Sequence, residues 1–285
     1  MHFMVSRNLR NKGPPNIDQA YDARPDAFKH AVEYLVWHMK EMLRNDGKPS
    51  FYDQGRFADA IRAGNKGDVK RFIKKGWADV NASHPICGTP LETAIRYGRL
   101  EIAEILIKSG ANVKTGSEGR PILPMACARG EYSTIPLDAQ LGIIKLLIRS
   151  GADVKVAGTN GWTALHIAAF WGSYEIARLL VENGADVNAE SEDHTTPLIN
   201  AVRNSNPRLV KLLLDNGASL DAKTYSYSGD EWSVMRHAEA FGHKYIINIL
   251  RERAEAKMLR ADASARKLYE ASKAEAWEQG ITLAE

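Results

Sequence analysis

The sequence predicts an all-α fold, a solenoid of about six stacked helix–turn–helix repeats. Residues 161–189 contain two short helices with their own stop signals, and the same pattern recurs at fixed offsets along the chain. The glycines that end the second helices, at positions 110, 151, 184 and 217, are 41, 33 and 33 residues apart. Neither helix of such a unit can bury its apolar stripe alone, so the units must stack on one another.

Residues 161–189 give the reference pattern of the repeat. Thr163 is placed to cap a first helix over residues 164–169, whose small side chains allow close stacking, and Gly172 ends it. A second helix follows and ends at Gly184, which supplies a left-handed residue. Its apolar stripe consists of Ile176, Ala177, Leu179 and Leu180, at helical spacing.

Further copies of the pattern lie on both sides of the reference unit. Clear copies open at Thr89 and Thr196, although Ser205 stands where the second of them should have its inter-helix glycine. Weaker copies open at Pro121 and Ser233. A first copy over residues 60–76 lacks the opening threonine and proline, as expected of an amino-terminal cap.

This repeating unit closely resembles the ankyrin repeat, whose period is 33 residues. The resemblance implies six repeats over about residues 55–250, each with a β-hairpin finger, and a concave face that binds protein partners. We therefore expect three parts: an N-terminal arm and capping helix at residues 1–50, an ankyrin repeat domain at 51–250, and a C-terminal helical extension at 251–285.

The chain is predicted to be helical on both sides of the repeats. Residues 1–24 are interpreted as a surface arm, and residues 26–44 as a helix that covers the first repeat or, alternatively, docks a partner. After Leu250, good helix formers continue to about Gln279. This helix is expected to be a solvated cap, with self-association or partner binding as the alternative. Its stripe consists of Ala254, Met258, Ala261, Ala265 and Leu268.

Two insertions interrupt the period. Nine residues, about Glu131 to Ala139, are added between the two helices of the third repeat. The last finger is four residues longer than the reference finger. It contains Tyr225, Tyr227 and Trp232 among small polar residues, a composition typical of binding loops.

Composition and charge exclude several classes of function. The 38 basic and 35 acidic residues leave a formal charge of +3, so the net charge implies neither a nucleic acid duplex nor a membrane as partner. The sequence has no run of 18 apolar residues, its first 15 residues contain no apolar stretch of the length typical of a signal peptide, and its last four residues do not form a lipidation motif, so we expect a cytoplasmic protein. The two cysteines, Cys87 and Cys127, fit a reducing compartment.

No catalytic or metal site is predicted. His166 and His243 stand where the ankyrin pattern has structural histidines, and we expect local hydrogen bonds from both. His84 and Cys87 lie three residues apart, but without a second pair at metal spacing they do not predict a zinc site. No phosphate-binding glycine loop or nucleophile motif occurs, so we expect no cofactor and no enzymatic activity.

Partner binding is expected at the finger tips and at the two residues before each inter-helix glycine. In ankyrin proteins these positions line the concave face. Here they carry arginines, including Arg62, and aromatic residues, which dominate interface energetics. The arginines favour a partner with acidic groups on its surface. The candidate residues are Arg96, Tyr97, Arg129, Trp162, Phe170, Trp171, Arg203, Asn204, Tyr225, Tyr227, Trp232 and Phe241.

Two functions remain open from the sequence. The first is a scaffold, or an inhibitor of the immunity type, that captures one protein across the concave face. The second is a sensor that stacks a small phosphorylated or nucleotide ligand on an aromatic ring and holds it with arginine. A structural interpretation of the aromatic residues also exists, in which Trp162 and Trp171 pack together and stay mostly buried.

Overall fold

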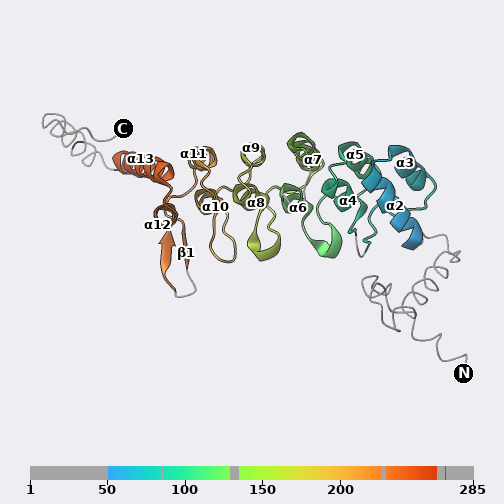
Figure 1. Ribbon diagram of the computed structural model, residues 1–285, viewed down its shortest axis with the longest axis horizontal. Coiled ribbons are helices and arrows are strands. Elements are labelled where there is room, and N and C mark those ends of the chain that lie inside the picture. Colours follow the sequence, from blue (N-terminus) through green and yellow to red (C-terminus); the bar gives the residue numbers. More distant parts are fainter. Residues whose placement is uncertain (1–50, 85–86, 129–134, 226–228, 262–266, 268–285) are drawn as a thin grey trace, which may run out of the picture. The chain divides into compact units, whose positions relative to one another are not determined.

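Six pairs of helices follow one another in the part of the chain that the structure describes (Figure 1). The computed structural model describes residues 51–84, 87–128, 135–225, 229–261 and 267. The chain divides into two units, residues 1–118 and 119–285. The arm and capping helix expected at residues 1–50 lie outside the described residues, as does nearly all of the extension beyond Ala261.

The first unit contains two helix pairs. Helix α2 (Phe51–Ala63) packs on α3 (Lys66–Lys74), and α4 (Pro90–Arg96) packs on α5 (Leu100–Lys108). The pairs stack as the repeat pattern predicts, because α2 also contacts α4 and α3 contacts α5.

The second unit contains four helix pairs arranged in two layers (Figure 1). The first helices of the pairs, each short, contact one another in sequence order, and so do the second helices. The predicted all-α solenoid is therefore confirmed. The first layer consists of α6 (Ile122–Cys127), α8 (Ala164–Phe170), α10 (Pro197–Arg203) and α12 (Val234–Ala240), and the second of α7 (Leu137–Arg149), α9 (Tyr174–Glu182), α11 (Pro207–Asp215) and α13 (Lys244–Ala261).

The first helices begin at capping residues and pack through alanine. Thr163 accepts a hydrogen bond from the backbone of His166, and Thr196 accepts one from the backbone of Ile199, which satisfies amides that the helix itself leaves unpaired. Five residues after each capping position stands an alanine that is buried. These alanines, which let neighbouring first helices approach closely, are Ala94, Ala126, Ala168, Ala201 and Ala238.

The turn between the two helices of a repeat requires a left-handed residue. Gly98 and Gly172 occupy it with φ angles of 64° and 66°. Ser205 occupies the same position in the next repeat with a φ angle of 51°, so a residue with a Cβ atom has been placed in a conformation that favours glycine.

Replacing Ser205 with glycine is expected to stabilise the protein by about 0.5–1 kcal/mol, because the relief of the left-handed strain exceeds the added entropy of the unfolded chain. The reverse substitution in the preceding repeat, Gly172→Ser, is expected to cost about 1 kcal/mol, since its Cβ would also lie 3.2 Å from Nδ2 of Asn206. Urea unfolding of both variants measures the two effects. A Ser205→Gly variant that is less stable than the wild type would contradict this account.

Part of the first insertion is helical, which corrects the expectation that residues 131–139 all lie between the helices. Helix α7 begins at Leu137 and has 13 residues, whereas α9 and α11 have nine. Pro136 precedes it with φ fixed near −58°, an angle suited to a helix start. Gln140 is buried and donates a hydrogen bond of 2.9 Å to the carbonyl oxygen of Ala126, which fastens the added turn to α6. Residues 131–134 lie outside the described residues.

The last finger differs from the other described fingers in its backbone pairing. Strands β1 (Lys223–Tyr225) and β2 (Glu231–Ser233) form an antiparallel ladder in which Thr224 lies opposite Trp232. Elsewhere in the described residues only isolated pairs occur in the fingers, such as Ala157 with Thr163. The four added residues give this finger enough length for a short sheet.

Helix α13 has 18 residues, twice the length of α9 and α11. Ion pairs hold it against the preceding repeat, between Arg253 and Asp215 and between Lys257 and Asp221. Among the described helices, none combines the length and the low charge needed to cross a membrane.

Candidate partner-binding surfaces

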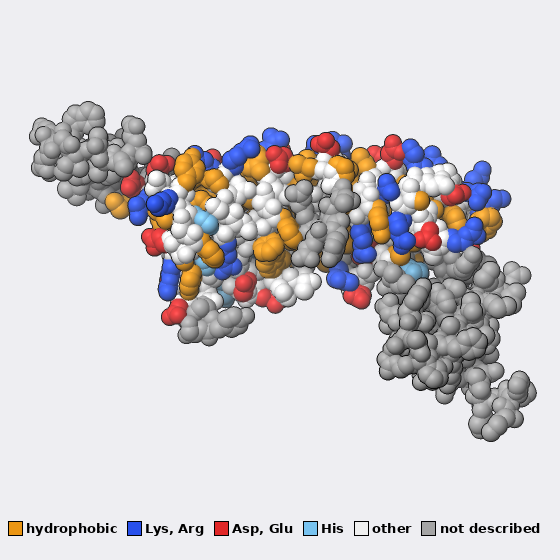
Figure 2. Space-filling view, viewed as in Figure 1, with side chains coloured by type: hydrophobic (Ala, Val, Ile, Leu, Met, Phe, Trp, Pro, Cys, Tyr) orange, Lys and Arg blue, Asp and Glu red, His pale blue; other side chains and the backbone are white. Residues whose placement is uncertain are grey.

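Three aromatic side chains of one repeat meet at the surface of the second unit, and we call Trp162, Phe170 and Trp171 the aromatic patch. The ring centroids of Trp162 and Phe170 are 5.5 Å apart, and those of Phe170 and Trp171 are 5.3 Å apart, both with edge-to-face geometry. Figure 2 shows hydrophobic side chains gathered over α8 and the finger before it.

The aromatic patch stands on a rigid base. Trp162 lies between a tight turn at Thr159–Gly161 and the capping residue Thr163, and its carbonyl oxygen accepts a 2.8 Å hydrogen bond from the amide of Gly158. Gly161 has a φ angle of 74°, and a Cβ atom there would lie 3.0 Å from the amide nitrogen of Glu192 in the next finger. The close approach of two fingers therefore needs glycine at this position.

The patch remains exposed although its rings contact one another. Phe170 is 44% exposed and Trp171 is 41% exposed, whereas Trp162 is half-buried. The structural interpretation, in which tryptophan packing buries the rings, thus accounts for Trp162 better than for its two neighbours. Contiguous exposed aromatic area contributes little to folding and is typical of interaction sites.

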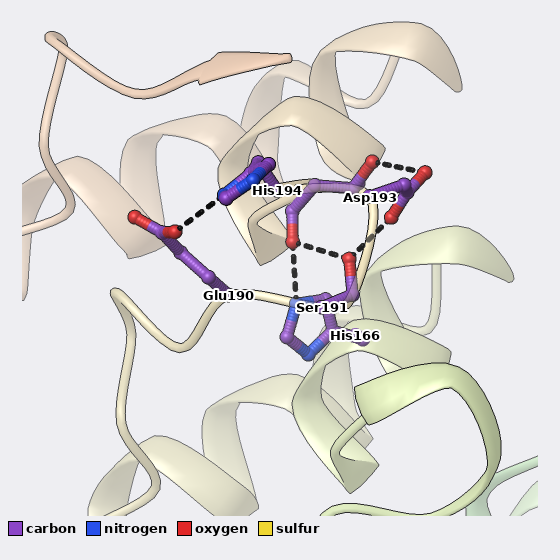
Figure 3. A network of polar contacts seen from close by, with 6 residues as sticks. His166, Glu190, Ser191, Asp193 and His194 are labelled. Carbon is purple, nitrogen blue, oxygen red and sulfur yellow. Dashed lines mark hydrogen bonds and ion pairs between the residues drawn. The ribbon is translucent and has the colours of Figure 1, made fainter. Parts of the chain in front are cut away.

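His166 lies beneath the patch in a hydrogen-bond network that includes the next finger (Figure 3). Its Nε2 is 2.9 Å from the carbonyl oxygen of Thr195, and its Nδ1 is 2.8 Å from the hydroxyl of Thr163. Burial lowers the pKa of His166, although hydrogen bonding to Thr195 opposes this effect. The histidine therefore fastens two repeats together as a neutral group, in accordance with the structural role expected from the sequence.

Asp193 is held in the same finger as an ordered carboxylate. The hydroxyl groups of Ser191 and Thr195 donate hydrogen bonds of 2.5 and 2.9 Å to its two oxygens. Burial alone would raise the pKa of Asp193, but these hydroxyl donors hold it below its ordinary value. Next to it, His194 lies 3.1 Å from a carboxylate oxygen of Glu190 and packs edge-on against the ring of Tyr225.

Arg203 is directed partly into the interface between two repeats. It is half-buried, and a guanidinium nitrogen lies 3.5 Å from Nε2 of His237 in the next repeat. The hydroxyl of Thr224 lies 2.9 Å from the same Nε2, and the ring of Trp232 packs against the imidazole at 5.2 Å. Arg203 and Trp232 are therefore less available than their sequence positions suggest. Phe241 and Asn204, by contrast, are exposed.

His237 is a buried titratable group that the sequence analysis did not single out. Burial, followed by the charges of Arg203 and Arg236, lowers its pKa to about 4. Its Nδ1 has no hydrogen-bond partner among the described residues. The preceding repeat has Asn200 at this position, so the sequence carried no signal of a special histidine.

Acidification is expected to destabilise the protein through His237. The folded-state pKa of about 4 lies below the ordinary value of 6.5, so the unfolded chain binds the proton more tightly. The stability contributed by neutral His237 is fully present above pH 6.5 and falls by about 2 kcal/mol between pH 6.5 and 4.5. Urea unfolding at several pH values measures this loss. A His237→Asn variant should lose less stability over the same range, and equal losses would contradict the assignment.

In the first unit, Arg62 lies beside an exposed aromatic ring and forms an ion pair of 3.2 Å with Asp59. The guanidinium of Arg62 lies 5.6 Å from the ring centroid of Tyr97, and it also donates to Sγ of Cys87 at 3.5 Å. Tyr97 is 41% exposed and Arg96 is exposed. The structure therefore brings Arg62 and Tyr97 together. Two other candidates, Arg129 and Tyr227, lie outside the described residues.

The cysteines and histidines of the described residues do not gather into a metal-binding group. Cys87 and Cys127 are both free and buried. Burial raises the pKa of the Cys127 thiol far above its ordinary value, so this residue acts as a small apolar side chain. His243 lies 3.4 Å from the carbonyl oxygen of Arg203 in the preceding repeat, so its contact is structural but joins two repeats, whereas the sequence predicted a local one.

Comparison with known proteins identifies the family. Models described as ankyrin repeats match residues 88–115, 117–191 and 135–224. The Notch-regulated ankyrin repeat-containing protein of Xenopus tropicalis is 31% identical over 100 residues, which cover 32% of this chain and 80% of that protein. The Danio rerio protein named Notch-regulated ankyrin repeat-containing protein A is 47% identical over 98 residues, which cover 32% of this chain and 80% of that protein. The chain belongs to the ankyrin repeat family.

Other ankyrin repeat proteins extend the similarity along the chain. A putative ankyrin repeat-containing protein of Treponema pallidum is 33% identical over 152 residues, covering 50% of this chain and 46% of that protein. An ankyrin repeat domain from Acinetobacter baumannii, solved by crystallography, matches with a TM-score of 0.59 and 24% identity, over 70% of this chain and 97% of the other. This second likeness concerns the fold alone. Ankyrin repeats are generally protein–protein interaction modules, and ankyrin repeat proteins are typically non-enzymatic adaptors.

Proposed function

We propose that this ankyrin repeat protein binds a protein partner through the aromatic patch, and acts as a scaffold or as an inhibitor that covers the partner's surface. The observation that carries the proposal is the exposure of Phe170 and Trp171 beside Trp162 on a rigid finger and helix. Tryptophan anchors that insert into a partner's pocket often supply 2 kcal/mol or more of binding energy each. Preorganised rings lose little conformational entropy on binding, which increases that contribution.

The exposed arginine and tyrosine of the first unit support a partner with acidic groups. Arg96 and Tyr97 are exposed, and the guanidinium of Arg62 lies over the tyrosine ring. Guanidinium groups form two-point hydrogen bonds with carboxylates, and a position over an aromatic ring orients the group for such contacts. In the second unit, the remaining exposed candidates are Asn204, Tyr225 and Phe241, which would add further contacts to the partner.

The geometry gives less support to a sensor of phosphorylated ligands in the second unit. Among the candidate arginines of the second unit, Arg203 lies within the described residues. Its side chain is half-buried beside His237. The finger next to the patch carries Glu192 and the ordered carboxylate of Asp193, which would repel a phosphate. A protein partner can cover the exposed rings with apolar groups and place no negative charge beside these carboxylates.

A pull-down from the native cell extract tests the proposal. The wild type is compared with a Phe170→Ala, Trp171→Ala double variant, and bound proteins and small molecules are both identified. A matched control is Tyr245→Ala, which removes a similarly exposed ring, 60% exposed, from α13 in the other helix layer. A protein retained by the wild type and the control but lost by the double variant would support the proposal. A difference confined to a small phosphorylated molecule would overturn it.

A further inference from the structure

The carboxy-terminal end of the second unit carries an apolar groove of about 450 Å³ between α12, α13 and the loop before β1. One charged pair, Asp221 and Lys257, lies at its rim. The apolar lining consists of Leu220, Val234, Met235, Leu250, Ala254 and Met258.

The groove lies where a further repeat would stack. Met235 occupies the repeat position held by Leu165 and Leu198 in the two preceding repeats, two residues after the capping residue. Those leucines are 0% and 1% exposed because the next repeat covers them, whereas Met235 is only half-buried. The end face therefore leaves apolar surface uncovered that every inner repeat buries.

Helix α13 extends this uncovered surface beyond the repeat. It is nine residues longer than α9 or α11, and Met258 in its added half is 56% exposed. Leu250, Ala254 and Met258 follow at intervals of four residues and all line the groove.

The charges at the rim suit pairing of the groove with an identical surface. A two-fold axis brings like residues of two copies near each other, so a surface of one charge sign would repel its copy. Asp221 and Lys257 give this rim one charge of each sign and no net charge. Two copies can exchange these ion pairs across the axis without leaving a charge unpaired.

We propose that this groove is the interface between two copies of the chain, in which α13 of one copy, with Met258, covers the end face of the other. The aromatic patch lies on a different repeat, so the proposal is independent of partner binding. An isologous interface of this kind buries Met235 and Met258 of both copies at once. The second copy then covers the end of the repeat stack, as a further repeat would.

Sedimentation equilibrium of the full chain, from about 1 to 200 µM, tests the proposal. We expect a monomer–dimer equilibrium with a dissociation constant between about 1 and 100 µM, as for small interfaces. Met258→Asp should raise this constant about 100-fold, because the symmetric interface receives the substitution twice. Met258 is exposed, so the variant should fold; circular dichroism checks this, and Ala254→Arg provides a second exposed substitution in the groove.

Tyr245→Asp is the matched control, since it introduces the same charge at an exposed residue of α13 that does not line the groove. This variant should dimerise like the wild type. A wild-type chain that stays monomeric throughout the range would overturn the proposal, and so would a dimer that Met258→Asp leaves unchanged. If a chain shortened after Lys267 dimerises while the full chain does not, residues 268–285 occupy the groove in place of a second copy, and the proposal fails.

Discussion

Replacing Leu180 with aspartate is expected to abolish cooperative unfolding of the second unit. Leu180 is fully buried on α9, between the two helix layers. The substitution removes a buried leucine, which alone costs about 2–5 kcal/mol, and places a carboxylate where no partner can compensate it. A total of more than about 5 kcal/mol approaches the whole stability of a typical domain. Circular dichroism and urea unfolding measure the loss.

The neighbouring residue provides a matched control for this prediction. Leu179 lies on the same helix but is half-buried, so Leu179→Asp can direct its charge to water and should cost about 1 kcal/mol. In the first unit, Ala94→Glu should be as damaging as Leu180→Asp, because Ala94 is fully buried in the alanine positions that bring first helices together. An unchanged urea midpoint in either buried variant would contradict the repeat assignment.

The Phe170→Ala, Trp171→Ala double variant is expected to lose about 3–4 kcal/mol of binding energy, which corresponds to a dissociation constant raised by about 150- to 1000-fold. Both rings are more than two-fifths exposed, so the stability of the fold should change by only about 1 kcal/mol. Calorimetric titration with the partner recovered in the pull-down measures the first quantity, and urea unfolding measures the second.

The two measurements together separate binding from folding. The proposal requires weak binding by a double variant that still unfolds cooperatively near the wild-type midpoint. If cooperative unfolding is lost, the rings belong to the core and the binding interpretation is wrong. Tyr245→Ala should change neither quantity, since its ring lies on α13 beside Lys211.

The repeat architecture could be predicted from the sequence because its determinants are local and recur. The capping Thr163, the buried Ala168 and the left-handed Gly172 act within one repeat, and the same residue types return at the same offsets. Ser205 shows the limit of residue-type rules, since the surrounding helices impose a left-handed angle on a residue other than glycine.

The orientation of individual side chains at the candidate surfaces could not be predicted in the same way. Arg203 and Arg96 hold equivalent positions in their repeats, yet only Arg203 has a histidine 34 residues later that draws its guanidinium inward. The helical start of the first insertion likewise depends on the contact between Gln140 and Ala126. Such outcomes depend on pairs of residues in different elements, and periodicity in one sequence does not reveal them.

The seven residues of α8 serve two purposes on separate sides of the helix. Leu165 and Ala168 are fully buried in the stack, whereas Phe170 and the adjoining Trp171 face outward. Mutations at the outward positions can therefore accumulate without threatening the fold, and mutations at the inward positions cannot. A lineage that carries this repeat could exchange one partner for another through a few surface substitutions, while selection for stability preserves the rest of the helix.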